Sequence, residues 1–450
     1  MRNTTVAFLG TLFAAVAAAH AQEAGSIPAT YAKQEVSIQM RDGKKLFTSI
    51  YTPKDASHPW PIMLTRTPYS VGPYGIDRYP ASLGPSDHFQ KEGFIFVYQD
   101  VRGRYMSEGE FVNVTPHRAV KSKPEEIDES TDTYDTIDWI VKNIPNNNGK
   151  VGMWGISYPG FYTAAGMIDA HPALKAASPQ APVSDWFIGD DFHHNGAFYL
   201  AHAFRFFDFF GHPRPVPTLP GPRPKSNTTD AYGYFLEMGP LANFETKYFK
   251  GDVAYWSEMM RHPTYDEHWK SRNIRTHLKN IRPAVMTVGG WFDAEDLFGA
   301  LKVYEAVEQQ SPGATNIIVM GPWYHGGWSG SDGESLGQVK FGSKTSVTYR
   351  EQMEFPFFCR YLKDKEDPKL AEATMFETGT NQWKKFDVWP PKNLVKKALY
   401  FHGGGKLSFE PPAGSDPAYR RGRRRSASRP SRNPSPSSTP AGRAGSRPRS

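Results

Sequence analysis

The feature of this sequence that most constrains its fold is a serine between two glycines, in the stretch Gly155-Ile-Ser-Tyr-Pro-Gly160. The apolar run 151–154 predicts a short buried strand before it, and the small residues 164–166 predict a helix after it. A turn this sharp forces the serine outward and leaves room only for small neighbours. The pattern is one residue longer than the usual Gly-x-Ser-x-Gly nucleophile elbow. Because Gly-x-Ser also occurs in ordinary turns, Ser157 is a candidate nucleophile that needs partners elsewhere.

Short apolar strands alternate with helical patterns along most of the chain, which predicts an α/β fold on a mostly parallel sheet. An alternating hairpin over 36–51, with its turn at 41–43, comes first. The further predicted strands span 61–65, 93–98, 151–154, 174–178, 283–288 and 316–320. Besides the helix after the serine, the predicted helices are one ending at 88–91, one over 132–143 and one over 297–309.

The 450 residues are enough for two or three domains, and two stretches depart from the α/β pattern. Residues 186–281 are rich in Phe, His, Tyr and Pro and lack short buried strands, so we predict a mostly helical inserted cap. The cap would divide the α/β domain into a first part, 22–185, and a second part, 282–392. A β-type pattern then appears around Gly403-Gly-Gly405, so residues 393–419 are predicted to begin a separate β domain.

The two ends of the chain differ from the rest. Arg2, the apolar run 6–19 and the cleavage pattern Ala19-His-Ala21 predict that residues 1–21 are a signal peptide, so the mature protein is expected to be periplasmic or secreted. The apolar run is too short for a membrane span, and no later stretch approaches the roughly 20 apolar residues that a span needs. Residues 420–450 hold ten arginines and no acidic residue, which predicts a disordered tail.

The basic tail admits two interpretations. It is either an arm for an anionic surface or the product of a shifted reading frame, since its abundant residues all have GC-rich codons. Without these ten arginines the net charge falls from +7 to −3, so the folded part is not predicted to bind nucleic acid. Cys359 is the only cysteine, so no intrachain disulfide can form.

Two further polar groups follow predicted strands downstream of the serine. The strand at 283–288 leads into Asp293, and the strand at 316–320 leads into His325. Reacting groups of open α/β sheets gather at the carboxyl ends of strands, so the order Ser157, Asp293, His325 predicts a catalytic triad. The alternatives are a loop histidine and an aspartate that forms a turn or caps a helix.

An oxyanion hole needs two hydrogen-bond donors. The backbone N–H of Tyr158, which follows the serine, is one candidate. The hydroxyl of Tyr69, just beyond the predicted strand 61–65, is the other. Tyr69 could equally be a packing aromatic on the pattern of the sequence alone.

Four motifs together resemble the serine hydrolases related to cocaine esterase and Xaa-Pro dipeptidyl-peptidase, and among them the α-amino acid ester hydrolases. The motifs are Arg66-Thr-Pro-Tyr69, Gly155-Ile-Ser-Tyr-Pro-Gly160, Gly290-Trp-Phe-Asp293 and Gly321-Pro-Trp-Tyr-His325. The resemblance covers roughly residues 30–419. It implies an α/β-hydrolase domain with an inserted helical cap and the start of a truncated C-terminal jelly-roll, and it favours Tyr69 as the second oxyanion donor.

The same resemblance implies a cluster of three carboxylates that binds a substrate α-ammonium group. The matching positions are Glu295, Asp296 and, in the motif Gly189-Asp-Asp-Phe-His193, Asp191 rather than its neighbour Asp190. Crowded carboxylates repel one another, and a bound cation relieves that repulsion. The alternative for Glu295 and Asp296 is that they favour the N-terminus of the next helix. Aromatic residues of the cap are candidates either for an acyl pocket or for its core: Trp186, Phe187, Phe192 and Tyr199.

The resemblance implies a serine hydrolase that cleaves α-amino acid esters and amides through an acyl-enzyme, and that transfers the acyl group to amines such as a β-lactam nucleus. It implies no metal or organic cofactor and no nucleic-acid or membrane partner, and it leaves a homo-oligomer open. One alternative is a dipeptidyl-peptidase-like or aryl-ester-cleaving enzyme of the same fold. A second alternative is a truncated secreted protein without catalytic activity.

Overall fold

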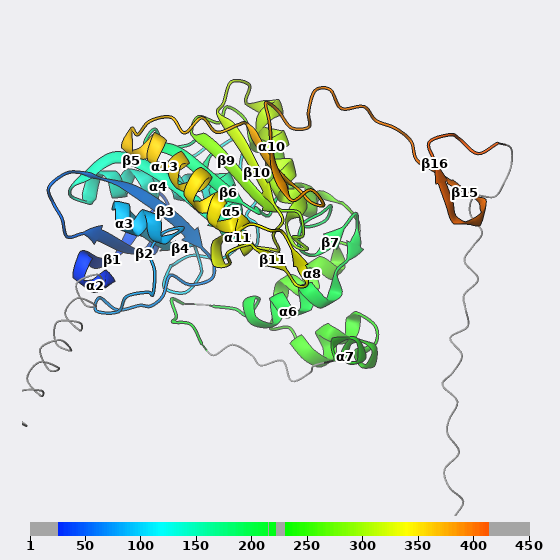
Figure 1. Cartoon of the computed structure of the whole chain (residues 1–450). Helices are drawn as coiled ribbons and strands as arrows, with labels where there is room; N and C mark the ends of the chain where they lie inside the picture. Colours follow the sequence, from blue (N-terminus) through cyan, green and yellow to red (C-terminus); the bar gives the residue numbers. More distant parts are fainter. Residues whose placement is uncertain (1–25, 215, 222–229, 414–450) are drawn as a thin grey trace, which may run out of the picture. The chain divides into compact units, whose positions relative to one another are not determined.

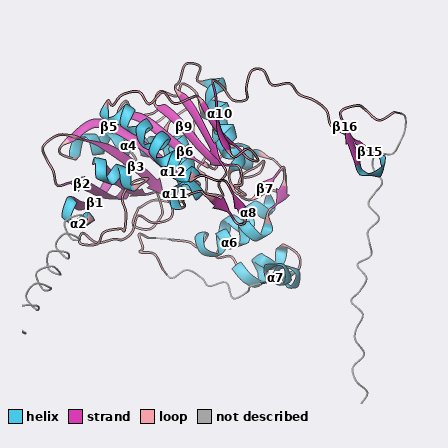
Figure 2. Ribbon diagram, viewed as in Figure 1, coloured by secondary structure: helices cyan, strands magenta, loops and turns pink. Residues whose placement is uncertain are grey.

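The centre of the fold is a ten-stranded sheet, in which a run of parallel strands is flanked by antiparallel edges (Figure 1 and Figure 2). In sheet order the strands are β1 (Tyr31–Gln39), β2 (Lys45–Pro53), β4 (Ile95–Asp100), β3 (Trp60–Thr67), β5 (Asn147–Ile156), β6 (Leu174–Gln180), β9 (Ala284–Gly290), β10 (Asn316–Gly321), β13 (Ala373–Glu377) and β14 (Gln382–Phe386). All neighbours from β4 to β13 pair in parallel. The predicted α/β class with a mostly parallel sheet is therefore confirmed.

The computed structural model describes residues 26–214, 216–221 and 230–413. The predicted signal peptide, 1–21, and the predicted disordered tail, 420–450, lie outside these residues. The chain divides into one unit up to Trp389 and a second unit from Pro390. Among the described residues, no helix is both long and apolar enough to cross a bilayer.

Helices cover both faces of the sheet because its central strands are apolar on both sides. Along β3, Ile62 and Leu64 join one hydrophobic cluster, whereas Met63 between them joins another. Side chains alternate between the faces of a strand, so the two clusters lie on opposite faces. The first includes residues of α4 (Glu129–Asn143) and α5 (Tyr158–Gly166), and the second includes residues of α3 (Asp87–Glu92) and α13 (Phe355–Lys363). A further helix, α10 (Leu297–Gln310), packs on β9 and β10.

A glycine lets α13 approach the central strand β5 closely. A Cβ atom at Gly152 would lie 2.7 Å from a methyl carbon of Leu362 and 2.9 Å from the sulfur of Met63. Real Cβ atoms do not approach other heavy atoms this closely, so any larger residue would push the helix away. Gly152 therefore fixes the packing directly before the serine turn.

The inserted segment 186–281 is mainly helical and has an aromatic core. Its elements are β7 (His193–His194), β8 (Ala197–Phe198), α6 (Leu200–Phe210), α7 (Ala231–Met238), a π-helix (Phe244–Phe249), α8 (Ala254–Arg261), α9 (Glu267–Lys270) and a 3₁₀ turn (Ile274–His277). Figure 1 shows α6, α7 and α8 gathered on one side of the sheet. The ring centroid of Phe204 on α6 lies 5.5, 5.4 and 5.5 Å from those of Phe235, Phe244 and Phe249. The core of this segment is therefore built from aromatic side chains on its helices rather than from buried strands.

The remaining elements lie at the ends of the sheet and beyond it. They are α2 (Ile27–Thr30), α11 (Gly327–Gly330), β11 (Ser335–Leu336), β12 (Val339–Lys340), α12 (Thr345–Tyr349), a π-helix (Arg350–Glu354), β15 (Tyr400–His402), a 3₁₀ turn (Gly403–Gly405) and β16 (Lys406–Ser408). In the second unit the described residues form one hairpin, β15–β16. A jelly-roll has eight strands, so the described part contains no such domain.

Beneath the end of β3, a buried arginine pairs with helix α4. The side chain of Arg66 is fully buried, and its guanidinium lies 2.9 Å from a carboxylate oxygen of Glu129 and 3.6 Å from one of Asp132. Its Nε also donates to Gln99 on β4, at 2.8 Å. Removing the arginine would leave the buried carboxylate of Glu129 without its cation, whereas Asp132 would keep its ion pair with Arg102 at 2.7 Å.

Replacing Arg66 by Met is expected to lower the free energy of unfolding by about 3–5 kcal/mol, the usual cost of breaking a buried ion pair from one side. Urea unfolding followed by circular dichroism measures this change. Lys142→Met is the matched control, since Lys142 pairs with Asp138 on the same helix at an exposed site and is expected to cost less than about 1 kcal/mol. Equal losses in the two variants would contradict the structural role of Arg66.

Candidate active site

Ser157 lies at the turn from β5 to α5, in a backbone conformation that non-glycine residues rarely adopt. Its φ and ψ are 68° and −127°. A Cβ at Gly155 would lie 2.3 Å from the carbonyl oxygen of Pro159, and one at Gly160 would lie 2.6 Å from that of Gln180. Both flanking glycines are therefore required, and the longer Gly-x-Ser-x-x-Gly spacing still produces a sharp elbow.

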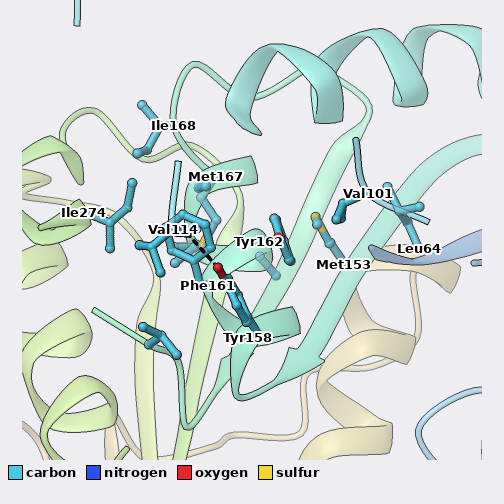
Figure 3. Packing of buried hydrophobic residues seen from close by; sticks show 14 of the residues in the cluster. Leu64, Val101, Val114, Met153, Tyr158, Phe161, Tyr162, Met167, Ile168 and Ile274 are labelled. Atoms are coloured by element: carbon cyan, nitrogen blue, oxygen red, sulfur yellow. Dashed lines mark hydrogen bonds between the residues drawn. The ribbon is translucent and has the colours of Figure 1, made fainter. Parts of the chain in front are cut away.

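Tyr158 fixes the first turn of α5. Its side chain is fully buried, and its hydroxyl accepts a hydrogen bond of 2.7 Å from the backbone N–H of Val114 (Figure 3). Around the ring, Figure 3 shows Phe161, Tyr162 and other core side chains packed closely. As the first helical residue, Tyr158 has a backbone N–H with no intrahelical acceptor. This N–H is held rigidly beside Ser157 and can donate to a negative oxygen there.

Tyr69 lies just beyond β3, and its hydroxyl lies near the side chain of Ser157. Its ring packs edge-on against Tyr158 and Phe210, with centroid distances of 6.3 and 5.5 Å. Burial and the nearby carboxylates raise the pKa of Tyr69 well above its usual value. The phenol therefore stays protonated at neutral pH and can act as a hydrogen-bond donor. The structure shows the packing of this residue against rings, and its place near the serine is compatible with the predicted role as an oxyanion donor.

Asp293 and His325 form a hydrogen-bonded pair after neighbouring strands. Asp293 follows β9 and His325 follows β10. The Nδ1 atom of His325 lies 2.9 Å from Oδ2 of Asp293. The other oxygen, Oδ1, accepts the backbone N–H groups of Glu295 and Asp296 at 2.8 and 2.9 Å. These three hydrogen bonds fix the carboxylate and, through it, the orientation of the imidazole.

The surroundings of His325 favour its charged form. Burial lowers its pKa, but the hydrogen bond to Asp293 and the charges of the nearby carboxylates outweigh burial and raise the pKa to about 9. The Nε2 atom, which does not face Asp293, lies 3.5 Å from Oε2 of Glu295. The imidazole therefore lies between carboxylates on both sides.

The side chain of Ser157 is oriented towards a carboxylate rather than towards the imidazole. Its Oγ lies 3.5 Å from Oδ2 of Asp296. Within the described part of the chain, no hydrogen bond joins Ser157 to His325. Catalytic hydrogen bonds are often long or misaligned before substrate binds, so this arrangement is compatible with a triad that closes on binding.

Asp296 does not cap helix α10, although it occupies the N-cap position. Its side chain accepts no hydrogen bond from the first turn of the helix. It is fully buried, with Oδ2 beside Ser157 and also 3.9 Å from Nδ1 of His325. Its Oδ1 has no hydrogen-bond partner among the described residues. Burial and neighbouring charges, chiefly that of Asp191, raise the pKa of Asp296 well above its usual range. Helix capping therefore does not account for this residue.

Asp191 and Asp190 have different surroundings although they are adjacent. Asp190 accepts hydrogen bonds from backbone N–H groups, including that of Gly299 at 2.7 Å, and it holds the loop together. Asp191 has a positive φ of 47°, and its Oδ1 lies 3.0 Å from Nε2 of His202. The positive charge and hydrogen bond of His202 outweigh burial and lower the pKa of Asp191. Asp191, not Asp190, therefore faces Glu295 and Asp296.

Glu295 is the most accessible member of the cluster, with a side chain 33% exposed. Its Oε2 lies 3.9 Å from Nε2 of His202, in addition to its contact with His325. Its backbone oxygen accepts the N–H of Asp191 at 2.9 Å, which joins the cap to the loop after β9. The three predicted carboxylates thus lie together beside Ser157.

Among the described residues, one set of side chains has the geometry to hold a metal ion. Ligand atoms of Asp191, His202 and Glu295 lie within 4.8 Å of one another. The hydrogen bond between His202 and Asp191 already satisfies two of these atoms. The set therefore serves equally well as a hydrogen-bonded cluster.

Sequence reasoning missed His202, and it named Trp186 only as an aromatic residue of an acyl pocket or of the cap core. His202, on the cap helix α6, contacts two carboxylates, and Trp186 donates its indole N–H to Oδ2 of Asp191 at 2.7 Å. No motif marks His202, because its position depends on how α6 packs. Trp186, Phe187 and Phe192 are buried in the cap, whereas Tyr199 is exposed, so the first three belong to its core rather than to an open pocket.

A serine on a strained strand-to-helix turn and a His–Asp pair at neighbouring strand ends define a cocaine-esterase-like serine hydrolase fold. The chain belongs to the X-Pro dipeptidyl-peptidase (S15) family, whose sequence profile matches residues 42–327, more than half of its length.

Relatives support this assignment. Cocaine esterase from Rhodococcus sp. (strain MB1 Bresler) is 26% identical over 398 residues, which cover 84% of this chain and 64% of the esterase. A crystal structure of an α-amino acid ester hydrolase superposes with a TM-score of 0.78 at 36% identity, covering 87% of this chain and 66% of that one. An aminopeptidase structure from a marine sediment archaeon, Thaumarchaeota archaeon, also gives 0.78, at 35% identity, covering 87% and 65%. The chain thus spans slightly less than two thirds of the length of these relatives.

Proposed function

We propose that this protein is a serine hydrolase of α-amino acid esters and amides, acting through an acyl-enzyme on Ser157. The observation that carries the proposal is the buried carboxylate of Asp296, 3.5 Å from the serine oxygen and without a partner for its second oxygen. With Asp191 and Glu295 it forms a cluster of carboxylates beside the acylation position, and a bound cation would favour the ionised form of each. A protonated α-amino group next to the scissile carbonyl complements this charge.

In the proposed reaction, the Oγ atom of Ser157 attacks the carbonyl carbon while His325 accepts the serine proton. The tetrahedral oxyanion receives hydrogen bonds from the N–H of Tyr158 and the hydroxyl of Tyr69. His325 then protonates the leaving alcohol or amine, and the carbon–heteroatom bond breaks. Water, activated by the same imidazole, attacks the acyl-enzyme and releases the amino acid. An amine such as a β-lactam nucleus would replace water in transfer.

A pair of methyl esters tests the substrate class. Phenylglycine methyl ester carries the α-ammonium group, and methyl phenylacetate is the same molecule without it. We expect kcat/KM at least about 30-fold higher for the amino ester, corresponding to about 2 kcal/mol of charge pairing that remains after desolvation. Equal kcat/KM values for the two esters would exclude the ammonium-binding role of the carboxylates. The same result would favour the alternative function, an aryl-ester esterase of this fold.

The similarity to an aminopeptidase raises a second candidate, since aminopeptidase substrates also present a free α-amino group. The same carboxylates would bind that group, and the difference lies in the leaving group. Three substrates of one amino acid separate the ester hydrolase from the aminopeptidase: its methyl ester, its anilide, and a dipeptide in which it is the amino-terminal residue. Preference for the dipeptide would favour peptidase activity.

The reaction rate is expected to depend on pH through His325. A general base must be neutral, and the pKa of His325 is about 9, so the active fraction rises as pH increases towards that value. For methyl phenylacetate, kcat/KM is expected to rise about tenfold per pH unit at neutral pH and to level off near pH 9. A profile that levels off near pH 6.5, the usual pKa of histidine, would show that the carboxylates do not hold the imidazole in its charged form.

A further inference from the structure

Two of the three carboxylates, Glu295 and Asp296, contact members of the proposed Ser–His pair. Glu295 lies 3.5 Å from Nε2 of His325, the nitrogen that must accept the serine proton. Asp296 lies 3.5 Å from the Oγ atom of Ser157, the atom that must give it. Nε2 of His325 and Oγ of Ser157 therefore each contact a carboxylate instead of contacting each other.

Resting on the proposed function, we infer that Glu295 is a positioning residue that, with Asp296, keeps Ser157 and His325 uncoupled until an ammonium group enters the cluster. An ammonium ion has three N–H donors and a positive charge, so it competes for the carboxylate oxygens that face the imidazole and the hydroxyl. Once Glu295 turns to the ammonium group, Nε2 of His325 becomes free to accept from Ser157. The α-ammonium group would thus activate the nucleophile as well as bind the substrate.

The mobility of the side chains favours Glu295 for this role. It is one third exposed, and within the described residues its carboxylate makes no hydrogen bond, only the ionic contacts with His325 and His202. Asp293, by contrast, is fixed by two backbone N–H groups and stays on Nδ1.

The electrostatics agree with this geometry. The charged groups facing His325 are Asp293 on one nitrogen, Glu295 on the other, and Asp296 at 3.9 Å, with Asp191 and His202 behind them. At pH 7, a base with a pKa of about 9 is neutral in only about one molecule in a hundred. Neutralising Glu295 with a bound cation removes one of the charges that raise this pKa. Each unit by which the pKa falls increases the neutral fraction about tenfold.

The test measures the rate at which a neutral alkyl fluorophosphonate labels Ser157. In this reaction the Oγ–P bond forms, fluoride leaves, and the serine proton passes to His325. Methylammonium chloride supplies the ammonium group without an acyl group, and tetramethylammonium chloride matches its charge without N–H donors. We expect methylammonium to accelerate labelling about tenfold at pH 7 and tetramethylammonium to have little effect.

The variant Glu295→Gln keeps the shape of the side chain and removes its charge. We expect it to be labelled about tenfold faster than the parent without methylammonium, to gain nothing further from it, and to show its labelling profile shifted to lower pH. Glu305→Gln, at an exposed position on α10, is the matched control and should behave as the parent does. The methylammonium measurement uses the parent protein, so it still tests the inference if the Glu295→Gln variant fails to fold.

Unchanged or slower labelling with methylammonium would overturn this inference. So would a Glu295→Gln protein labelled at the parent rate. These outcomes are separable from failure of the proposed function. If the protein prefers phenylglycine methyl ester but methylammonium does not accelerate labelling, the proposed substrate class stands and the uncoupled Ser157–His325 pair is excluded. If methylammonium accelerates labelling but the ester preference is absent, the uncoupled pair stands and the substrate class is excluded.

Discussion

Replacing Ser157 by Ala is expected to lower kcat for phenylglycine methyl ester by about 10⁴- to 10⁶-fold and to abolish labelling by fluorophosphonates. The substitution removes only the Oγ atom, and the neighbouring donors on Tyr69 and Tyr158 remain in place. Any residual rate would come from binding and from these donors acting on attack by water. Steady-state kinetics and mass spectrometry of the labelled peptide measure both effects.

Ser329→Ala is the matched control for this experiment. Ser329 is exposed on α11, near His325 in the sequence, and its hydroxyl bonds only to the carbonyl oxygen of Gly326. It is expected to leave both turnover and labelling unchanged. Turnover near the parent rate in Ser157→Ala would place the nucleophile elsewhere. Absence of labelling in the folded parent protein would favour a secreted module without catalytic activity.

Replacing Asp296 by Asn is expected to lower kcat/KM for the amino ester by about 30- to 150-fold, which corresponds to 2–3 kcal/mol. The change is isosteric, but it replaces an ionisable acceptor with an amide whose NH₂ group would face the incoming cation. Methyl phenylacetate, which brings no cation, should not be slowed. The ratio between the two esters is therefore the decisive quantity, rather than either rate alone.

Two comparisons make the Asp296 result specific. Glu305→Gln removes an acidic charge from the same helix outside the site and should leave the ratio unchanged. Equal losses on both esters in Asp296→Asn would mean that Asp296 supports the catalytic machinery or the packing of α10. An unchanged ratio in Asp296→Asn, Asp191→Asn and Glu295→Gln together would exclude the carboxylate cluster as the ammonium site.

Local patterns predict the central part of the fold because its strands are short, apolar and bounded by polar turns. The predicted strand 316–320 corresponds to β10, and the predicted helix 297–309 corresponds to α10 within one residue. The helix after the serine begins at Tyr158, six residues before the small-residue stretch that predicts it. Pro159 at its start is compatible with a first helical turn, which the apolar pattern alone does not indicate.

The last two strands of the sheet are not predicted, and their sequences explain why. β14 contains two lysines in five residues and has no buried face, because it is an edge strand. β13 is apolar, but its five residues offer too little periodicity to separate a strand from a loop. β13 depends on pairing with β10, and β14 on pairing with β13, contacts that local sequence does not encode.

The residues of the site also divide into those that local sequence predicts and those that it does not. Ser157, Asp293 and His325 are predictable because parallel strands bring their carboxyl ends to one edge of the sheet. His202 is not, because it reaches Asp191 through the packing of a cap helix whose position depends on aromatic contacts. The choice of Asp191 over Asp190 rested on a motif, and the structure gives it a physical basis in the backbone bonds that occupy Asp190.

The insertion of the cap between β6 and β9 has a consequence for how the chain folds. These strands are neighbours in the sheet, yet residues 181–283 separate them in sequence, and closing a loop of that length costs about 4 kcal/mol of chain entropy beyond a constant term. Ser157 precedes the insertion in the sequence and His325 follows it, so the elbow and the proposed base belong to two separate halves of the sheet. The proposed nucleophile and base therefore come together only after the sheet has closed around the insertion.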